Sequence, residues 1–162
     1  MKPIIPPDLC REYKKLDQRD ALRIIAMTDG IPALVSLFRL DVSFEENIRN
    51  LFTADSLYLR YAEEKLRQEF RSPESYTTLL YGLAIGCNRI SQLAEFSGYP
   101  KNKCDKYLKA LDAAGYIEMQ QKKDENGQAR THYYLKGGYH RAWYQVYFPR
   151  QQDFIDPLDE SA

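Results

Sequence analysis

Residues 89–116, RISQLAEFSGYPKNKCDKYLKALDAAGY, contain two short stretches of helical periodicity separated by a turn with glycine and proline. In the second stretch, Cys104, Leu108 and Leu111 recur at i, i+4 and i+7, so they share the face that should meet a core, and Tyr107 partly joins them. Lysines occupy the opposite face. Two short helices around a tight turn are typical of a helix-turn-helix.

The next segment, residues 117–136 with the sequence IEMQQKKDENGQARTHYYLK, alternates in the manner of a β-hairpin and has a polar tip that contains Gly127. A hairpin in this place makes the helix-turn-helix a winged helix. Helical patterns also fill the residues before it. We therefore predict a mainly α protein, in which a helical bundle is followed by a winged helix-turn-helix with a small β-hairpin wing.

Winged helices commonly dock on duplex DNA, with the second helix of the motif in the major groove. Candidate DNA-binding residues on that helix are Lys101, Asn102, Lys103, Lys106 and Lys109. Candidates in the wing are Lys122, Lys123, Arg130 and His132. Because Asp124 and Glu125 make the tip acidic, we expect phosphate contacts from residues of the two strands and not from the tip itself. An ordinary solvated lysine face, or a winged helix that contacts protein, is the alternative.

Charge is balanced over the 162 residues, with 23 Lys and Arg against 23 Asp and Glu, so no global field draws the chain to nucleic acid. The charges are segregated, however. Residues 101–150 hold ten Lys and Arg against five Asp and Glu, whereas residues 151–162 hold four acids and no base. Any affinity for DNA must therefore come from the winged-helix region.

Catalytic and metal-binding patterns are lacking. The sequence contains neither a P-loop nor a G-x-G-x-x-G motif, and we expect no enzyme, cofactor or metal site in this chain alone. Its three cysteines, Cys10, Cys87 and Cys104, have no C-x-x-C spacing, and we expect His132 and His140 to be surface or hydrogen-bonding residues. No apolar run reaches the roughly 18 residues of a membrane span, and we expect a protein of the reducing cytoplasm with no membrane partner.

The helix boundaries can be predicted from capping residues. Asp17 should cap a helix that ends near Met27, and Ser43 should open another, three residues before Glu46. Asn88 should cap the first helix of the helix-turn-helix. A long charged helix is expected over residues 56–70, and an aromatic helical segment over residues 138–148. The apolar stripe of the first of these helices is expected at Ala21, Leu22, Ile25 and Ala26.

The order of these parts carries a resemblance to a known family. ALRIIAMTDGIPALVSLF, then SFEENIRNLF, a long charged helix and a winged helix with KYLKALDAAGYI resemble the C-terminal part of archaeal-type AAA+ ATPases of the STAND and related clades. In that family a P-loop core precedes a helical lid with a G-x-P motif and a winged helix. The resemblance covers residues 8–148 and implies that Gly30, Ile31 and Pro32 contact a nucleotide held by the core. A helix end followed by a helix start is the alternative interpretation of this triplet.

The chain departs from the family in having no Walker A lysine, no Walker B acid and no core sheet, and Asp29 stands where a glycine often precedes the motif. The resemblance implies that ATP and Mg²⁺ are bound by a larger parent protein, and that the P-loop core of this parent is a partner of the chain. The winged helix makes double-stranded DNA the other expected partner. Ser72 and Pro73 mark the end of the long charged helix, and we expect a domain boundary there. The chain then divides into a subdomain that resembles the lid (1–72), a winged-helix domain (73–150) and an acidic tail (151–162).

We expect a regulatory or DNA-binding module whose lid moves with nucleotide state, the helix at residues 56–70 passing that movement on as a rigid body. Alternatives are a stand-alone MarR- or ArsR-like dimeric transcription regulator and a winged helix used for protein contacts.

Overall fold

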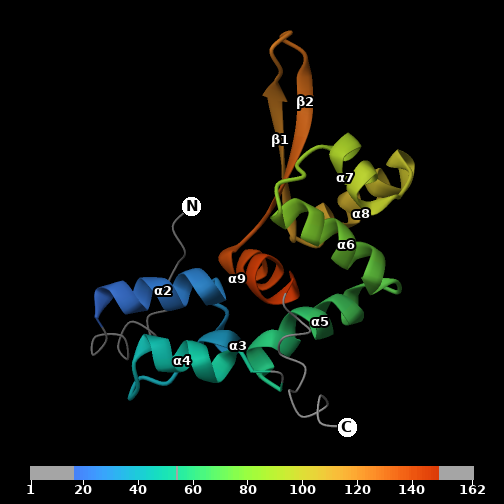
Figure 1. The fold of residues 1–162 in the computed structure, drawn as a ribbon. Coiled ribbons are helices and arrows are strands. Elements are labelled where there is room, and N and C mark those ends of the chain that lie inside the picture. The colour runs from blue at the N-terminus through green and yellow to red at the C-terminus, as the bar shows by residue number, and fades with distance from the viewer. Residues whose placement is uncertain (1–16, 54, 150–162) are drawn as a thin grey trace.

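The computed structural model describes residues 17–53 and 55–149, and its ribbon is shown in Figure 1. The N-terminal half consists of helices α2 (Gln18–Thr28), α3 (Pro32–Val35), α4 (Phe44–Leu51) and α5 (Leu57–Glu69). Helices α6 (Pro73–Ala84), α7 (Ile90–Ser97) and α8 (Lys101–Ala113) follow, then strands β1 (Ile117–Lys123) and β2 (Ala129–Leu135). The described chain closes with α9 (Gly138–Ala142) and the π-helix η1 (Trp143–Tyr147). The prediction of a mainly α fold with a β-hairpin wing is confirmed. Cys10 and the acidic tail lie outside the described residues.

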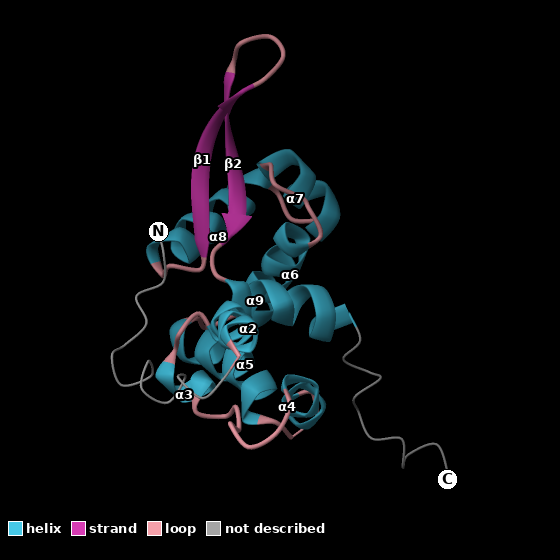
Figure 2. Cartoon of the chain, turned by 90° about the vertical axis from the view of Figure 1, so that its left-hand side faces the viewer, coloured by secondary structure: helices cyan, strands magenta, loops and turns pink. Residues whose placement is uncertain are grey.

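The antiparallel hairpin projects from the helices as an arm in both ribbon views (Figures 1 and 2). The segment formed by α9 and η1, residues 138–147, lies between the N-terminal helices and α6 in both views. It contacts α2 through α9, and α5 and α6 through η1. The C-terminal aromatic segment therefore joins the two halves of the chain.

Side chains begin several helices as the sequence predicts. Asp17 Oδ1 accepts from the amide of Arg19 at 3.3 Å, and Ser43 Oγ accepts from the amide of Glu46 at 3.2 Å. The start of α7 differs from the prediction, because its N-cap is Arg89 and not Asn88. The amides of both residues donate to Gln92 Oε1, at 3.3 and 3.1 Å. Gln92, the third residue of the helix, thus makes the backward-reaching bond of a capping box.

The buried face of α2 also differs from the prediction. Leu22 is 59% exposed and Ala26 is exposed, whereas Ile24 and Thr28 are buried beside Ile25. Both sets recur at helical spacing, so periodicity alone does not decide between them. Thr28 fits the interior because its hydroxyl donates to the carbonyl of Ile24 at 2.7 Å, which satisfies the polar group.

One buried cluster runs through both halves of the chain. It includes Ile24 and Tyr58 from the N-terminal helices, Leu80 and Leu108 from the winged helix, and Trp143 from η1. The expected division at residue 72 falls between α5 and α6, which are joined by this cluster. The two halves consequently share one interior across that division.

Candidate nucleic-acid interface

Helix α8 is anchored by the face that the sequence assigns to the core. Cys104, Leu108 and Leu111 are all fully buried, which confirms that prediction. The opposite face is open to solvent, with Asn102 and Lys106 exposed. Because the buried residues fix the rotation of the helix, its polar first turn must face outward beside the hairpin.

The candidate residues on α8 do not form a single stripe. At 100° per residue, Asn102, Lys106 and Lys109 lie opposite the core, while Lys101 and Lys103 lie on opposite flanks. Lys103 Nζ stands 3.9 Å from the ring centroid of Tyr99, so part of its charge is directed at an aromatic face. Asn102 and Lys106 are exposed on the side of the helix opposite the core.

Lys109 is engaged in an ion pair. Its Nζ lies 2.7 Å from Asp105 Oδ2, one helical turn earlier, and this hydrogen bond raises the pKa of Lys109 above its usual value. Both side chains are substantially exposed, so the pair adds little stability. The carboxylate of Asp105 nevertheless offsets the positive charge of Lys109 at the middle of α8.

A polar cleft of about 400 Å³ lies beside the first turns of α7 and α8, with β2 as its third wall. Its lining includes the basic residues Arg89 and Lys101, together with Asp105 and Thr131. Arg130 also borders it, but its side chain belongs to the other face of the hairpin and bonds Asp124. The loop before α7 is tied to this wall, since the amide of Tyr133 in β2 donates to the carbonyl of Asn88 at 2.8 Å. Arg89 is absent from the candidates drawn from the sequence, where its place before the first helix gave it no partner.

The wing candidates are divided between the two faces of the hairpin. Register pairs Lys122 with Arg130 and Gln120 with His132, and side chains alternate along each strand. Lys122, Arg130 and His132 therefore share one face, and Lys123 belongs to the other. Lys122 Nζ hydrogen-bonds Tyr134 Oη on its own face at 2.5 Å.

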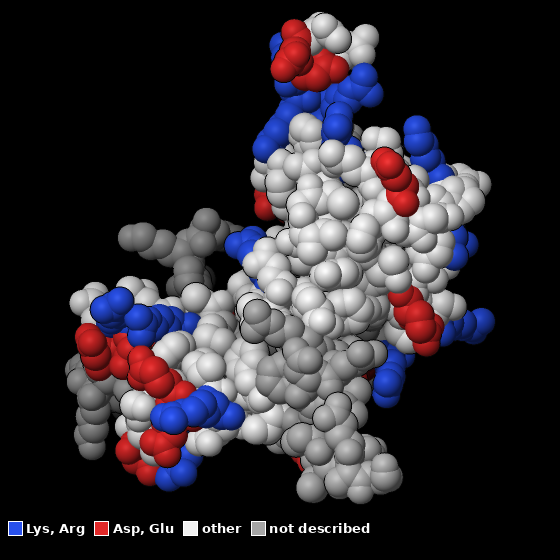
Figure 3. Space-filling view, in the orientation of Figure 1, with Lys and Arg blue, Asp and Glu red and all other residues white. Residues whose placement is uncertain are grey.

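The acidic tip of the hairpin is organised around Asp124. Its carboxylate accepts from the amides of Gln128 at 2.9 Å and Asn126 at 3.0 Å, and from Arg130 Nε at 3.1 Å. These bonds, that to Gln128 first, lower the pKa of Asp124. Arg130 is thus held by Asp124, and Glu125 remains exposed. The space-filling view shows basic side chains gathered along the hairpin below this red tip (Figure 3).

The two histidines occupy different environments. His132 is half-buried, and its Nδ1 has no hydrogen-bond partner among the described residues. His140 is only 6% exposed, so it is not the surface residue of the prediction, and its buried Nε2 has no hydrogen-bond partner among the described residues. Its ring packs 5.0 Å from that of Tyr116 and 5.2 Å from that of Tyr139, and burial, followed by the charge of Lys65, lowers its pKa to about 4.

The Gly30–Ile31–Pro32 triplet forms the turn between α2 and α3. Gly30 has φ +69°, and its amide donates to Thr28 Oγ1 at 3.3 Å. Ile31 is the N-cap of α3, and Pro32, its first residue, is exposed. Locally the triplet thus ends one helix and begins the next. Sequence reasoning missed its neighbour, since Asp29 accepts from two amides of α9, 109 and 110 residues away.

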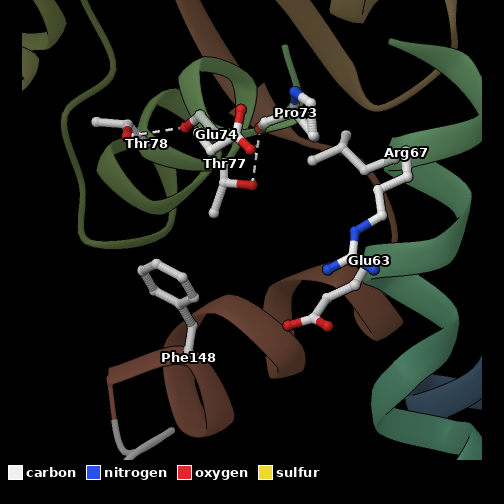
Figure 4. Close-up of a pocket in the computed structure, with 8 residues that line it drawn as sticks. Glu63, Arg67, Pro73, Glu74, Thr77, Thr78 and Phe148 are labelled. Atoms are coloured by element: carbon white, nitrogen blue, oxygen red, sulfur yellow. Dashed lines mark hydrogen bonds between the residues drawn. The ribbon is translucent and has the colours of Figure 1, made fainter. Parts of the chain in front are cut away.

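A second cleft, of about 340 Å³, lies between α5, α6 and Phe148 (Figure 4). Glu63 and Arg67 line it from α5, and Pro73 and Glu74 from α6. This lining carries two carboxylates against one guanidinium, so it suits an anion poorly. The cleft beside Arg89 and Lys101 is the better candidate for contact with phosphate.

Comparisons with known proteins give one distant relationship. The chain is 24% identical over 151 residues to an uncharacterized protein of Methanocaldococcus jannaschii, in an alignment that covers 92% of this chain and 34% of the relative. The chain therefore spans about a third of the length of the relative it matches. No family model and no solved structure matches it.

Over residues 17–53 and 55–149, no three His, Cys, Asp or Glu side chains come together as metal ligands could. None of the helices in the described part of the chain has the length and apolar character needed to cross a bilayer.

Proposed function

We propose that this chain binds duplex DNA through a surface formed by the first half of α8, the start of α7 and the lower part of the hairpin. The observation that carries the proposal is the joint placement of Arg89 and Lys101 on one polar cleft beside β2. Asn102 and Lys106 lie exposed on the adjoining helix face. Basic groups at the starts of α7 and α8 thus converge on one side of the winged helix.

Each part of this surface suits a different part of the duplex. Asn102 and Lys106, near the start of α8, would reach base edges in the major groove, where amide and ammonium groups pair with acceptors and donors of the bases. Arg89 and Lys101 would contact the phosphate backbone beside the helix. Lys123, on the hairpin face that also carries Thr131 of the cleft, would extend this contact along the wing.

The N-terminal helices give the module its wider role in this proposal. Their order resembles the lid of an AAA+ or STAND-type ATPase, and Gly30, Ile31 and Pro32 would contact a nucleotide bound by a P-loop core in a parent chain. The relative's length, about three times the part aligned here, is compatible with such a parent. ATP and Mg²⁺ would belong to that core, and the whole would work in the reducing cytoplasm.

The DNA-binding proposal is tested by fluorescence anisotropy with a labelled duplex over a series of salt concentrations. Replacing Arg89, Lys101 and Lys106 by alanine should weaken binding about 100-fold and reduce the slope of log K against log salt by about two to three. A matched control, with Arg49, Arg60 and Arg71 replaced by alanine, removes the same charge from exposed positions outside the winged helix.

The control variant should bind as the unchanged protein does. Equal losses in both variants would mean that only net charge matters, which contradicts a defined surface. If the unchanged protein shows no salt-dependent binding, a winged helix that contacts protein is the better explanation.

A further inference from the structure

The first turn of α9 is held by the side chain of Asp29, which directly follows α2 and lies 109 residues earlier in the chain than Gly138. Asp29 Oδ1 accepts from the amide of Gly138 at 2.6 Å, and Oδ2 accepts from the amide of Tyr139 at 3.0 Å. Asp29 itself adopts φ 53°, in the left-handed region that non-glycine residues rarely occupy. A backbone conformation with a local cost therefore positions the carboxylate as the cap of a distant helix.

The same turn of α9 inserts a hydroxyl into the backbone of α5. Tyr139 Oη donates to the carbonyl of Tyr58 at 2.5 Å and accepts from the amide of Ala62 at 3.0 Å. In a regular α-helix a carbonyl and the amide four residues later bond each other. Tyr139 Oη thus contacts a carbonyl and an amide that can bond each other without it. One turn further along, Trp143 Nε1 donates to the carbonyl of Leu59 at 2.7 Å.

We propose that the first turn of α9 is a releasable latch between the N-terminal helices and the winged helix. In the closed state Asp29 caps the turn, and Tyr139 occupies the α5 backbone. On opening, the two capped amides turn to water, Tyr139 withdraws, and the Tyr58 carbonyl bonds the Ala62 amide directly. Trp143 keeps its packing. Because this carbonyl and amide are one helical turn apart, they satisfy each other without Tyr139, so opening leaves neither of them unpaired and two discrete states result.

The position of Asp29 suggests what operates the latch. It directly precedes Gly30, Ile31 and Pro32, so a ligand or partner that shifts this turn also shifts the carboxylate. Release of α9, which continues into η1 against α6, would then change how the winged helix is held. This regulatory use rests on the proposed DNA binding, whereas the latch itself does not, and its test needs no DNA.

Amide hydrogen exchange of the intact chain tests the latch. Asp29→Gly keeps the left-handed turn and removes the carboxylate, so exchange of the Gly138 and Tyr139 amides should rise about tenfold or more while that of Leu108 stays unchanged. Asp29→Asn tolerates the same turn and keeps one acceptor oxygen, and should fall between. Equal acceleration at Leu108 would show global unfolding instead of local opening, and no acceleration at α9 would also overturn the proposal.

A pair of tyrosine variants tests the substitute bond in α5. Tyr139→Phe removes the inserted hydroxyl, and the Ala62 amide should stay protected to within about threefold, because the Tyr58 carbonyl replaces it.

Tyr58→Phe is the matched control. Tyr58 Oη donates to the carbonyl of Met27 at 2.8 Å, and the amide that could replace it, that of Ile31, already donates to Thr28. Tyr58→Phe should raise the exchange of the slowest amides about tenfold, because the carbonyl of Met27 is left without a hydrogen-bond partner. A Tyr139→Phe variant with an exposed Ala62 amide, or with losses equal to those of Tyr58→Phe, would refute the latch.

Discussion

Gly138 packs against the carbonyl oxygen of Ala26 so closely that a Cβ at Gly138 would overlap that oxygen. Its neighbour Gly137 has φ +89°, and a Cβ there would lie 2.5 Å from Asp29 Oδ2. Two successive glycines thus let the start of α9 approach the end of α2. This contact is what allows Asp29 to reach the amides of Gly138 and Tyr139.

The contact predicts that Gly138→Ala destabilises the protein. The new methyl group would meet backbone, which cannot rotate away, so we expect a loss of about 2–3 kcal/mol in the free energy of unfolding, measured by urea denaturation. Gly82→Ala is the matched control in a helix. There the Cβ would meet the side chains of Phe96 at 2.9 Å and Leu93 at 3.0 Å, and side chains can shift where the Ala26 carbonyl cannot, so we expect a smaller loss. If Gly82→Ala lowered the free energy of unfolding as much as Gly138→Ala, the result would argue against the backbone contact.

Burial of His140 predicts acid destabilisation. Its pKa is lowered from 6.5 to about 4 in the folded protein, so folding disfavours the protonated imidazole. The stability that neutral His140 provides is complete above pH 6.5 and is lost as the pH falls from 6.5 towards 4, by on the order of 3 kcal/mol. Urea unfolding across this pH range measures the loss.

The variant His140→Gln cannot be protonated, and its stability should depend less steeply on pH in that window. His132→Gln keeps His140 in place, so the slope of the unchanged protein should persist. A slope unaltered by His140→Gln would assign the acid sensitivity to other groups.

The orientation of α2 predicts that two of its aliphatic residues, Ile24 and Leu22, contribute very differently to the free energy of unfolding. Ile24 is 1% exposed and Leu22 is 59% exposed. Ile24→Ala should lower the free energy of unfolding by about 2–5 kcal/mol, through lost burial and a cavity. Leu22→Ala should change it by about 0.5 kcal/mol or less, as surface substitutions usually do. Thermal or urea denaturation of the two variants would expose a helix rotated the other way, because the order of the losses would then be reversed.

The bond between Asp124 and Arg130 predicts that the hairpin tip restrains DNA binding. Asp124→Asn removes a negative charge and weakens the hold on Arg130, so duplex affinity should rise several-fold and the salt slope should steepen by about one. Glu125→Gln removes the same charge without releasing Arg130 and should give the smaller gain. Salt-series anisotropy compares them, and equal gains would leave charge alone as the cause.

Local patterns in the sequence carried much of the fold. The spacing of Cys104, Leu108 and Leu111 identifies the buried face of α8, because a residue's place on a helix follows from its number. Glycine and polar residues at 124–128 mark the hairpin turn between β1 and β2. The candidate DNA-binding residues on α8 could be found from their spacing in the same way. Arg89 could not, since its place at the cleft depends on β2 lying beside α7.

The sequence by itself determined the helical spacing, the capping residues and the hairpin, all of which depend on neighbours within a few positions of the chain. Only the tertiary structure decided which face of α2 is buried, that His140 is enclosed, and that Asp29 caps α9 from 109 residues away. Those contacts join residues distant in sequence, and each is selected by how whole helices pack, which no local periodicity encodes.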